Sequence, residues 1–490
     1  MKGRGKPLSI VVIGASGDLA RHKVIPALFT LYCRKLLPAR FQVIGFARSD
    51  FTNETFRAAL AETVTCRHTP RRDCRKFTDD FLSRCFYCRG EYASIDAFLD
   101  LYGLLRDLEG GAGGDRLFYM AVPPSLFVEV AQAIGGAGLV HCGGPDWSRV
   151  VIEKPFGSDR SSSDRLVHAM RQVFTEEQTF RIDHYLGKEV IQNLLVLRFA
   201  NAVFEPLWNR RHIAGVEIIW QEADGVGLRG GYFDQYGIVR DVVQNHLLQM
   251  LALTAMEPPT ALDEPEAVRA SKVRLLRSVA RVRRLDMVLG QYRRARVEGK
   301  MRPDYRAEPH VPKDSRTPTY AALRLRVENP RWQGVPFLIR AGKALARRTT
   351  EIRLHFHPVP GNIFGNLPAP RRANMLVLRV QPDEAIYLRV VNKLPGLAME
   401  MVETPLDLRY AAAFRRKTIP SAYECLLWEA LQGDHGLFIS EDELAAAWDV
   451  FTPVLHEIDR GKHEPEPYEW GGPGPAAARR LAEDCGVFRE

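Results

Sequence analysis

Apolar runs alternate with amphipathic helical segments over the first third of the chain. The strand-like runs cover residues 8–13, 41–46, 116–122 and 149–152. Helical periodicity begins at residue 18 and continues over a long stretch at 51–108. Strands separated by helices are typical of βαβ units, in which helices cover a parallel sheet. The pattern predicts an α/β, Rossmann-type doubly wound domain over residues 1–182.

The pattern changes after residue 190, where longer segments alternate between apolar and polar positions. These segments are AGVEIIWQEAD, AALRLRVEN, TEIRLHFHPV, NMLVLRVQP and AIYLRVVNK. Alternation with a period of two is typical of half-buried strands. We therefore expect a larger α+β domain over residues 183–490, with a big, mainly antiparallel sheet faced by helices. Residues 299–318 are expected to form a surface loop, and GGPGPAAARR a loop followed by a short helix.

A glycine turn joins the first strand-like run to the first helix. The turn contains Gly14, Gly17 and Ala20, and Ser16 stands where a G-x-G-x-x-G motif would have its middle glycine. A strand that turns into a helix presents backbone N–H groups that bind a pyrophosphate. On its own this signal is weak, because many tight turns use Gly and Ser.

The second strand-like run ends in Arg48 and Ser49. An enzyme that uses NAD would place an acidic residue here for the ribose hydroxyls, whereas a cation suits the 2′-phosphate of NADP. NADP is therefore the favoured cofactor, with Ser16 and Arg48 as the residues that discriminate.

The segment RIDHYLGKE at 181–189 combines cations, a histidine, a tyrosine and a glycine. Several charged or hydroxyl donors that converge on one point are what a phosphate group needs. An alternative is a solvated turn between two elements.

Composition excludes several classes of protein. The 490 residues suffice for at least two cores, and 46% hydrophobic with 26% charged residues is ordinary for a globular protein. No apolar stretch approaches the roughly 20 residues of a membrane span. The net charge of +9 raises the question of nucleic-acid binding. The cations are dispersed, with no zinc-finger spacing, RNP motif or basic tail, so we favour an enzyme for small polyanions.

Seven motifs together resemble the glucose-6-phosphate dehydrogenase family, in the family's order and over nearly the whole chain. They are GASGDLARHK at 14–23, GFARSD at 45–50, VIEKPFG at 151–157, RIDHYLGKE at 181–189, LRFAN at 197–201, RGGYFDQYGIVRDVVQNHLLQ at 229–249 and IRAGKAL at 339–345. The resemblance implies an NADP-dependent oxidoreductase that converts glucose 6-phosphate to 6-phosphogluconolactone, the first step of the oxidative pentose phosphate pathway. It also implies a homodimer or homotetramer.

Oxidation of an anomeric hydroxyl requires a base, because a proton leaves the oxygen as hydride leaves the carbon. A histidine of near-neutral pKa oriented by a carboxylate fits this task. His246 lies on an expected helix beside two leucines, where a lone histidine is commonly a core residue instead. The resemblance makes His246 the catalytic base and Asp183 its partner. His184 is the alternative base, but the resemblance assigns it to the phosphate.

The remaining site residues are implied by the resemblance. The substrate-binding set is Lys154, His184, Tyr185, Lys188, Glu222, Asp241, Lys343 and Arg348. The cofactor-binding set is Gly14, Ser16, Gly17, Asp18, Leu19, Arg48 and Lys154. The alternatives are an exposed turn lysine for Lys154 and ordinary surface ion pairs for Glu222 and Asp241. Pro155 is a candidate cis-proline.

The chain departs from the pattern of a second, structural NADP site found in many eukaryotic members. It keeps Arg340, Arg353, Arg379 and Tyr387. It has Gln221 and Thr349 where lysines are preferred, and it lacks the aromatic residues at the C-terminus. These departures weaken the case for that second site.

Four of the eight cysteines, namely Cys66, Cys74, Cys85 and Cys88, fall within one short stretch. Only one true CxxC occurs, and Phe81, Cys85 and Cys88 are expected to share a buried helical face, so we predict no metal site. Cys66 and Cys74 are expected to lie in a polar, arginine-rich loop that would lower the pKa of their thiols and favour thiol exchange. This segment resembles redox-regulated plastid forms of the plant and algal enzyme, which implies a Cys66–Cys74 disulfide that thioredoxin reduces.

The same resemblance favours the chloroplast stroma, with the cytoplasm as the alternative. The first strand-like run begins near residue 7, which leaves no room for a transit or signal peptide. We therefore expect either the mature part of a stromal precursor or a cytoplasmic enzyme in which the cysteine pair is vestigial. Two rival functions are a catalytically silent NADP-binding sensor and an enzyme with broader hexose-6-phosphate or glucose oxidation. The sensor predicts degraded site residues, whereas Lys154, Asp183, Lys188 and His246 are all present.

Overall fold

The computed structural model describes residues 6–65, 71–111, 113–141, 143–361, 373–415 and 417–487. It divides into two compact units. The first comprises Met1–Lys188, Ala261–Arg269 and Thr418–Leu444, and the second comprises the remainder. The expected boundary between residues 182 and 183 therefore differs from the division seen here, in which Asp183 and His184 belong to the first unit.

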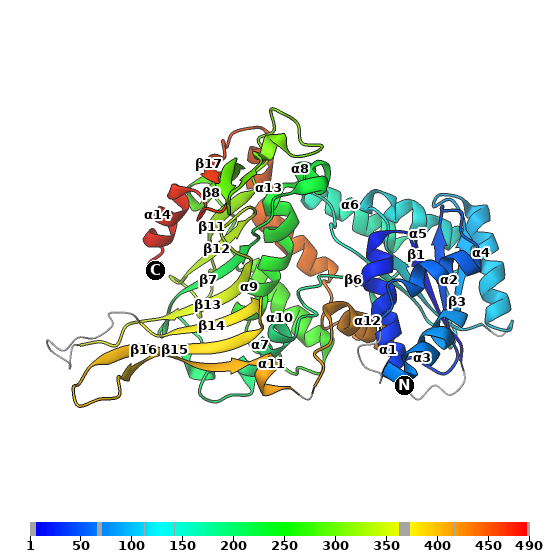
Figure 1. The fold of residues 1–490 in the computed structure, drawn as a ribbon, viewed down its shortest axis with the longest axis horizontal. Helices are drawn as coiled ribbons and strands as arrows, with labels where there is room; N and C mark the ends of the chain where they lie inside the picture. The colour runs from blue at the N-terminus through cyan, green and yellow to red at the C-terminus, as the bar shows by residue number, and fades with distance from the viewer. Residues whose placement is uncertain are drawn as a thin grey trace. The chain divides into compact units, whose positions relative to one another are not determined.

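A parallel six-stranded sheet organises the first unit, which contains β1, β3 and β6 (Figure 1). The strand order is β3-β2-β1-β4-β5-β6. Its strands are β1 (Leu8–Ile13), β2 (Phe41–Ala47), β3 (Cys85–Arg89), β4 (Asp115–Met120), β5 (Ser148–Ile152) and β6 (Thr179–Arg181). Every residue of β1 and β2 is buried, as expected for a parallel sheet covered on both faces. The predicted Rossmann-type fold is confirmed.

Helices flank these strands in the doubly wound pattern. They are η1 (Ala20–Val24), α1 (Ile25–Cys33), α2 (Asn53–Ala61), α3 (Arg71–Ser83), α4 (Ile95–Leu108), η2 (Pro124–Leu126), α5 (Phe127–Gly136), α6 (Arg160–Arg171), η3 (Glu176–Gln178) and α12 (Ala422–Gln432). The prediction of one long helical stretch over 51–108 was wrong at β3. The alternating burial of CFYCR, which pairs in parallel with β2, places these residues in the sheet.

A late segment of the chain completes the first unit. Leu426, Leu427 and Phe438 belong to the same apolar core as β1 and α1. The guanidinium of Arg149 on β5 donates to the carbonyls of Ala430 and Leu431 at 2.8 Å each, near the end of α12. The end of a helix leaves carbonyls without partners, so these donors tie α12 to the sheet.

A nine-stranded sheet organises the second unit, in the order β16-β15-β14-β13-β7-β12-β11-β8-β17. Its strands are β7 (Ile213–Gln221), β8 (Met287–Arg293), β11 (Tyr320–Arg326), β12 (Pro336–Gly342), β13 (Thr349–Phe356), β14 (Met375–Gln381), β15 (Ala385–Lys393), β16 (Met401–Arg409) and β17 (Glu466–Glu469). The pairs β7–β12 and β8–β17 are parallel and the others antiparallel. This confirms the large, mainly antiparallel sheet; β9 (Ala295–Val297) and β10 (Lys300–Arg302) pair separately.

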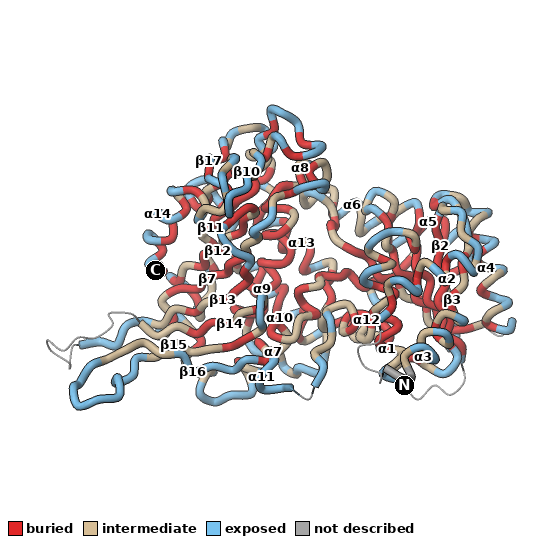
Figure 2. The backbone as a smooth tube through the Cα atoms, in the orientation of Figure 1, coloured by how far each residue is buried: buried red, intermediate tan, exposed pale blue. Residues whose placement is uncertain are grey.

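The second unit also contains helices. They are α7 (Glu189–Phe199), η4 (Glu205–Leu207), η5 (Gly227–Arg229), α8 (Gly230–Ile238), η6 (Val239–Leu247), α9 (Leu248–Ala255), η7 (Arg284–Asp286), η8 (Tyr305–Ala307), α11 (Tyr410–Ala413) and α14 (Ala476–Asp484). Two further helices belong partly to each unit, namely α10 (Pro265–Arg277) and α13 (Glu441–Asp459). Figure 2 shows that α9 is buried and that the β15–β16 hairpin is exposed toward its tip. In the part of the chain that is described, no helix is long and apolar enough to cross a membrane.

The segment 299–318 is more than the surface loop that its polarity predicts. Tyr305 is fully buried and donates to Asp234 on α8 at 2.7 Å. Thr317 donates to the backbone carbonyl of the same Asp234 at 2.8 Å. These contacts fix the segment against α8 although most of its residues are polar. The predicted helix near the C-terminus is confirmed as α14.

Candidate active site

The glycine turn follows β1 as predicted. Gly14 has a φ of 89°, and a Cβ added there would come within 2.4 Å of the carbonyl oxygen of Ala121. Gly17 donates its N–H to the Gly14 carbonyl at 3.0 Å, which closes the turn before η1. Ser16 is half-buried and Asp18 is exposed. Leu19, packed against the core, anchors the helix start so that its first N–H groups are presented at the end of β1.

Arg48 follows the end of β2 and is exposed. Its guanidinium lies 5.2 Å from the ring centroid of Tyr92. Burial raises the pKa of Tyr92, whereas the nearby Arg48 acts in the opposite direction. A guanidinium held on an aromatic face keeps its remaining N–H donors available for an anion.

Lys154 follows the end of β5, and the Lys154–Pro155 peptide is cis, as predicted. The preceding residue, Glu153, is buried and accepts a hydrogen bond from the Tyr119 phenol at 2.7 Å. Burial raises the pKa of Glu153, and hydrogen bonds from Tyr119 and Tyr423 act against that rise. Lys154 is thus attached to a buried, hydrogen-bonded anchor, while it is itself half-buried.

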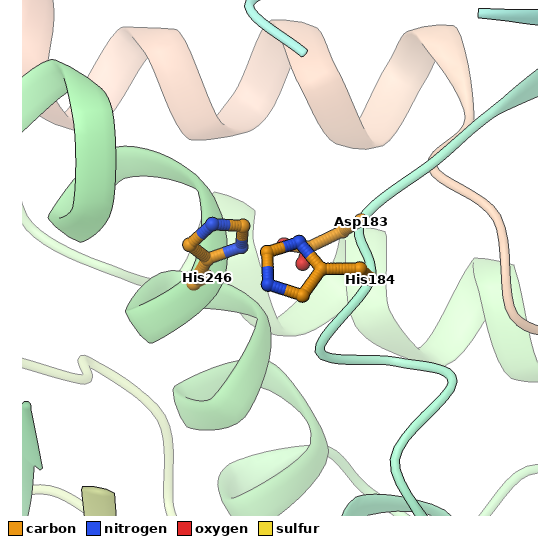
Figure 3. Close-up of side chains that lie close together, drawn as sticks. All are labelled: Asp183, His184 and His246. Carbon is orange, nitrogen blue, oxygen red and sulfur yellow. The ribbon is translucent and has the colours of Figure 1, made fainter. Parts of the chain in front are cut away.

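The loop after β6 carries Asp183 and His184 (Figure 3). Asp183 is buried, and its Oδ1 accepts the backbone N–H of Tyr185 at 2.9 Å. The His184 ring lies 5.0 Å from the Tyr185 ring, and the Lys188 Nζ lies 4.9 Å from the centre of that same ring. The structure therefore brings the three predicted phosphate-binding side chains together on one loop of the first unit.

Arg181 does not share this arrangement, although the density of cations in RIDHYLGKE pointed to phosphate binding. It is buried and pairs with Glu176 at 2.8 Å. Arg269 pairs with the same carboxylate at 2.6 Å. Arg181 is therefore a structural residue. The sequence of this segment predicted more cations for phosphate binding than the structure provides.

Glu222 and Lys343 meet in the second unit. The Lys343 Nζ lies 2.5 Å from Glu222 Oε2, and it lies 5.2 Å from the centre of the Trp220 ring. The backbone N–H of Glu222 donates to the Gly342 carbonyl at 2.9 Å, where β7 and β12 run side by side. An ammonium beside a carboxylate offers both a donor and an acceptor to a polyol hydroxyl.

His246 lies on a helical segment (Figure 3), which is the π-helical η6. Asp241 lies on the same η6, which follows a kink at Gly237, where φ is 66°. His246 is 3% exposed, and Asp241 is half-buried. The Arg240 guanidinium donates to both carboxylate oxygens of Asp459 on α13, at 3.0 and 2.7 Å. π-helical turns are frequent at functional sites. His246 belongs to the second unit and Asp183 to the first, so their pairing stays a prediction.

Arg348 is exposed just before β13.

The residues considered for a second, structural NADP site also lie in the second unit. Gln221, Arg340 and Arg353 line a cavity of about 620 Å³. Arg340 pairs with Glu217 at 2.9 Å and Arg353 with Glu351 at 2.8 Å, so both guanidinium groups already have carboxylate partners.

The cysteine predictions have mixed outcomes. Cys74 is disulfide-bonded and lies on α3, so it is not in a loop. Cys66 lies outside the described residues. Cys85 and Cys88 lie on β3, which corrects the expectation that they share a helical face with Phe81. Burial raises the pKa of the Cys85 thiol to about 12 and that of Cys88 to about 11, so both stay protonated at neutral pH.

The sequence did not point to Tyr119, Glu153 or Tyr423. Glu153 is adjacent to the lysine of the EKPFG motif, which was the one local signal available. Tyr423 lies far along the chain, and only the return of α12 to the first unit reveals its place.

Comparison with protein families matches both parts of the chain. Residues 11–193 match the model described as "Glucose-6-phosphate dehydrogenase, NAD binding domain". Residues 195–488 match "Glucose-6-phosphate dehydrogenase, C-terminal domain". A nicotinamide cofactor is therefore supported for the first unit.

Individual relatives agree with this result. The chain is 49% identical over 483 residues to "Glucose-6-phosphate 1-dehydrogenase 1, chloroplastic" of Arabidopsis thaliana, covering 98% of this chain and 83% of that protein. It is 44% identical to the cytoplasmic form 5 of the same plant, covering 98% and 92%.

One solved structure, described as "Glucose-6-phosphate dehydrogenase in complex with its substrate glucose-6-phosphate", aligns with a TM-score of 0.91 at 39% identity, covering 99% of this chain and 98% of that one. The chain belongs to the glucose-6-phosphate dehydrogenase family.

Proposed function

We propose that the protein oxidises glucose 6-phosphate to 6-phosphogluconolactone, with NADP as the hydride acceptor. The observation that carries this proposal is the loop at 183–188, where His184, Tyr185 and Lys188 lie together beside a buried carboxylate. The solved relative that holds glucose 6-phosphate aligns over nearly the whole chain. Every residue that the resemblance assigns to the site is present.

In this reaction His246 takes the proton from the anomeric hydroxyl, and Asp183 orients and stabilises the imidazolium that forms. The hydride leaves the same carbon for the nicotinamide, which supplies the redox chemistry when bound. Glu222 and Asp241 accept protons from the other sugar hydroxyls. His184, Tyr185 and Lys188 bind the phosphate, with Lys343 and Arg348 at the same sugar-phosphate site.

Replacement of the base tests this chemistry. We expect His246→Asn to lower kcat by roughly 10²–10⁴ while the KM for glucose 6-phosphate changes little, because the amide cannot accept the proton. The measurement is the initial rate of NADPH formation at neutral pH. Near-full turnover in this variant would remove His246 from the catalytic role and leave His184 as the alternative.

The phosphate loop predicts a specific loss of affinity. Lys188→Ala and His184→Ala should each raise the KM for glucose 6-phosphate, since each removes a charge-assisted contact worth about 1.5–3 kcal/mol. The KM for unphosphorylated glucose should stay nearly constant. Arg181→Met is the matched control, because Arg181 is on the same segment but pairs with Glu176. Equal effects on both sugars would contradict the assignment.

The choice of NADP rests on Arg48, which is exposed and held on the ring of Tyr92. The unaltered protein should reduce NADP in preference to NAD with glucose 6-phosphate as substrate. Arg48→Ala should weaken NADP use by roughly tenfold or more and leave NAD use nearly unchanged, because only NADP carries the 2′-phosphate. Parallel losses with both cofactors would make Arg48 a structural residue.

We also propose that the protein is a homo-oligomer that uses the β15–β16 hairpin. β16 is an edge strand, and the hairpin exposes several large apolar side chains, namely Val391, Leu394, Leu397, Met399, Leu406 and Leu408. An exposed apolar edge strand is a pairing surface. Light scattering should give the molar mass of a dimer or tetramer for the unaltered protein, and Leu406→Glu should shift that mass toward the monomer. The control variant Leu285→Glu, at another exposed leucine, should leave the molar mass unchanged. A monomeric unaltered protein would refute this.

The disulfide of Cys74 supports a redox-controlled enzyme of the chloroplast stroma, as do the similarities to chloroplastic relatives. We propose Cys66 as the partner of Cys74 and thioredoxin as the reductant. Reduction would free α3, which packs against α1 and α2.

Activity should therefore fall after incubation with reduced thioredoxin or dithiothreitol. Cys66→Ser should have low activity that reductant does not change. If both proteins are equally active under oxidising and reducing conditions, the cytoplasm becomes the better location.

A further inference from the structure

Tyr423, at the start of α12, contacts two different parts of the first unit. Its ring lies parallel to that of His184, with an interplanar angle of 6° and centroids 6.4 Å apart. Its hydroxyl interacts with the buried carboxyl group of Glu153. We propose that Tyr423 is a positioning residue, which sets Lys154 through Glu153 and sets His184 through its ring. This inference rests on the proposed function, because Lys154 and His184 are the residues through which it acts.

The hydroxyl group of Tyr423 acts on the end of β5. The Glu153 carboxylate is buried and accepts a hydrogen bond from Tyr119 on β4 at 2.7 Å. The hydroxyl of Tyr423 on α12 interacts with the same carboxylate. A buried carboxylate depends strongly on such donors, since burial disfavours its charge. Glu153 directly precedes Lys154, so the two phenols fix the backbone from which the lysine side chain extends.

The ring of Tyr423 acts on the loop at 183–188. A Cβ added to Gly187 would come within 2.5 Å of the carbonyl oxygen of Ala422, so this loop and the start of α12 are in close backbone contact. His184 therefore has the Tyr423 ring along one side and the Tyr185 ring nearby. Aromatic neighbours restrict the orientation of an imidazole without using its nitrogen atoms.

The two contacts predict separable defects. Tyr423→Phe removes the hydroxyl and keeps the ring, so kcat should fall roughly tenfold, equal to about 1.4 kcal/mol, with the KM for glucose 6-phosphate within about twofold of the original. Tyr423→Leu removes both contacts, so it should add a rise of roughly tenfold in the KM for glucose 6-phosphate. The KM for unphosphorylated glucose should not show this second rise.

Two other phenols provide controls. Tyr119→Phe removes the hydrogen bond that Tyr119 donates to Glu153 and should lower kcat as Tyr423→Phe does, without the rise in KM for the phosphorylated sugar. Tyr102→Phe removes the hydroxyl of a half-buried phenol on α4, whose ring centre lies 5.7 Å from the Arg116 guanidinium, and should leave both constants unchanged. The steady-state constants are measured with both sugars on the oxidised full chain, together with thermal unfolding. If Tyr423→Leu does not fold, Tyr423→Met replaces it.

The inference is overturned if Tyr423→Phe matches the unaltered enzyme in kcat, or if Tyr423→Leu raises KM equally for glucose and glucose 6-phosphate. A kinetic loss that Tyr102→Phe reproduces would also overturn it, because the effect would then be general destabilisation. Failure of the proposed function is a different result: the unaltered protein itself would form no NADPH from glucose 6-phosphate.

Discussion

The docking of residues 418–444 onto the parallel sheet is the contact on which the first unit depends. Leu426, Leu427 and Phe438 add to a core that β1 and α1 begin. Arg149 ties the end of α12 to β5, and Gly187 admits the close approach of Ala422. The loop proposed to bind phosphate is therefore held by a segment that follows it by more than two hundred residues. A displaced α12 would leave that loop without its support.

The order of the six strands explains where the site residues of this unit lie. In a doubly wound sheet, ligands bind beyond the carboxyl ends of the strands. The glycine turn follows β1, Arg48 follows β2, Lys154 follows β5, and Asp183 follows β6. Residues distant in sequence thus occupy one edge of one sheet. The fold gives them rigid strand ends, and loops carry only the last few residues to the ligand.

Local patterns in the sequence predicted much of the fold and several features of the site. Buried strands, the glycine turn and the Rossmann-type domain follow from periodicity and from short motifs, and the resemblance supplied the roles of single residues. The pattern failed at β3, where a short mixed strand between helices has no distinctive period. It also failed at Arg181 and Tyr305, since a charge or a polar loop does not reveal its buried partner. Long-range contacts such as Glu153 with Tyr423 have no local signal.

The proposed transfer of hydride from the anomeric carbon of a sugar phosphate to NADP can be followed with an isotope. The protein is supplied with glucose 6-phosphate that carries deuterium at that carbon, together with NADP, and the label in the recovered coenzyme is determined by mass spectrometry. We expect the reduced coenzyme to carry the deuterium and the sugar to be recovered as the lactone or its hydrolysis product. Reduced coenzyme without deuterium, or no reduced coenzyme at all, would contradict it.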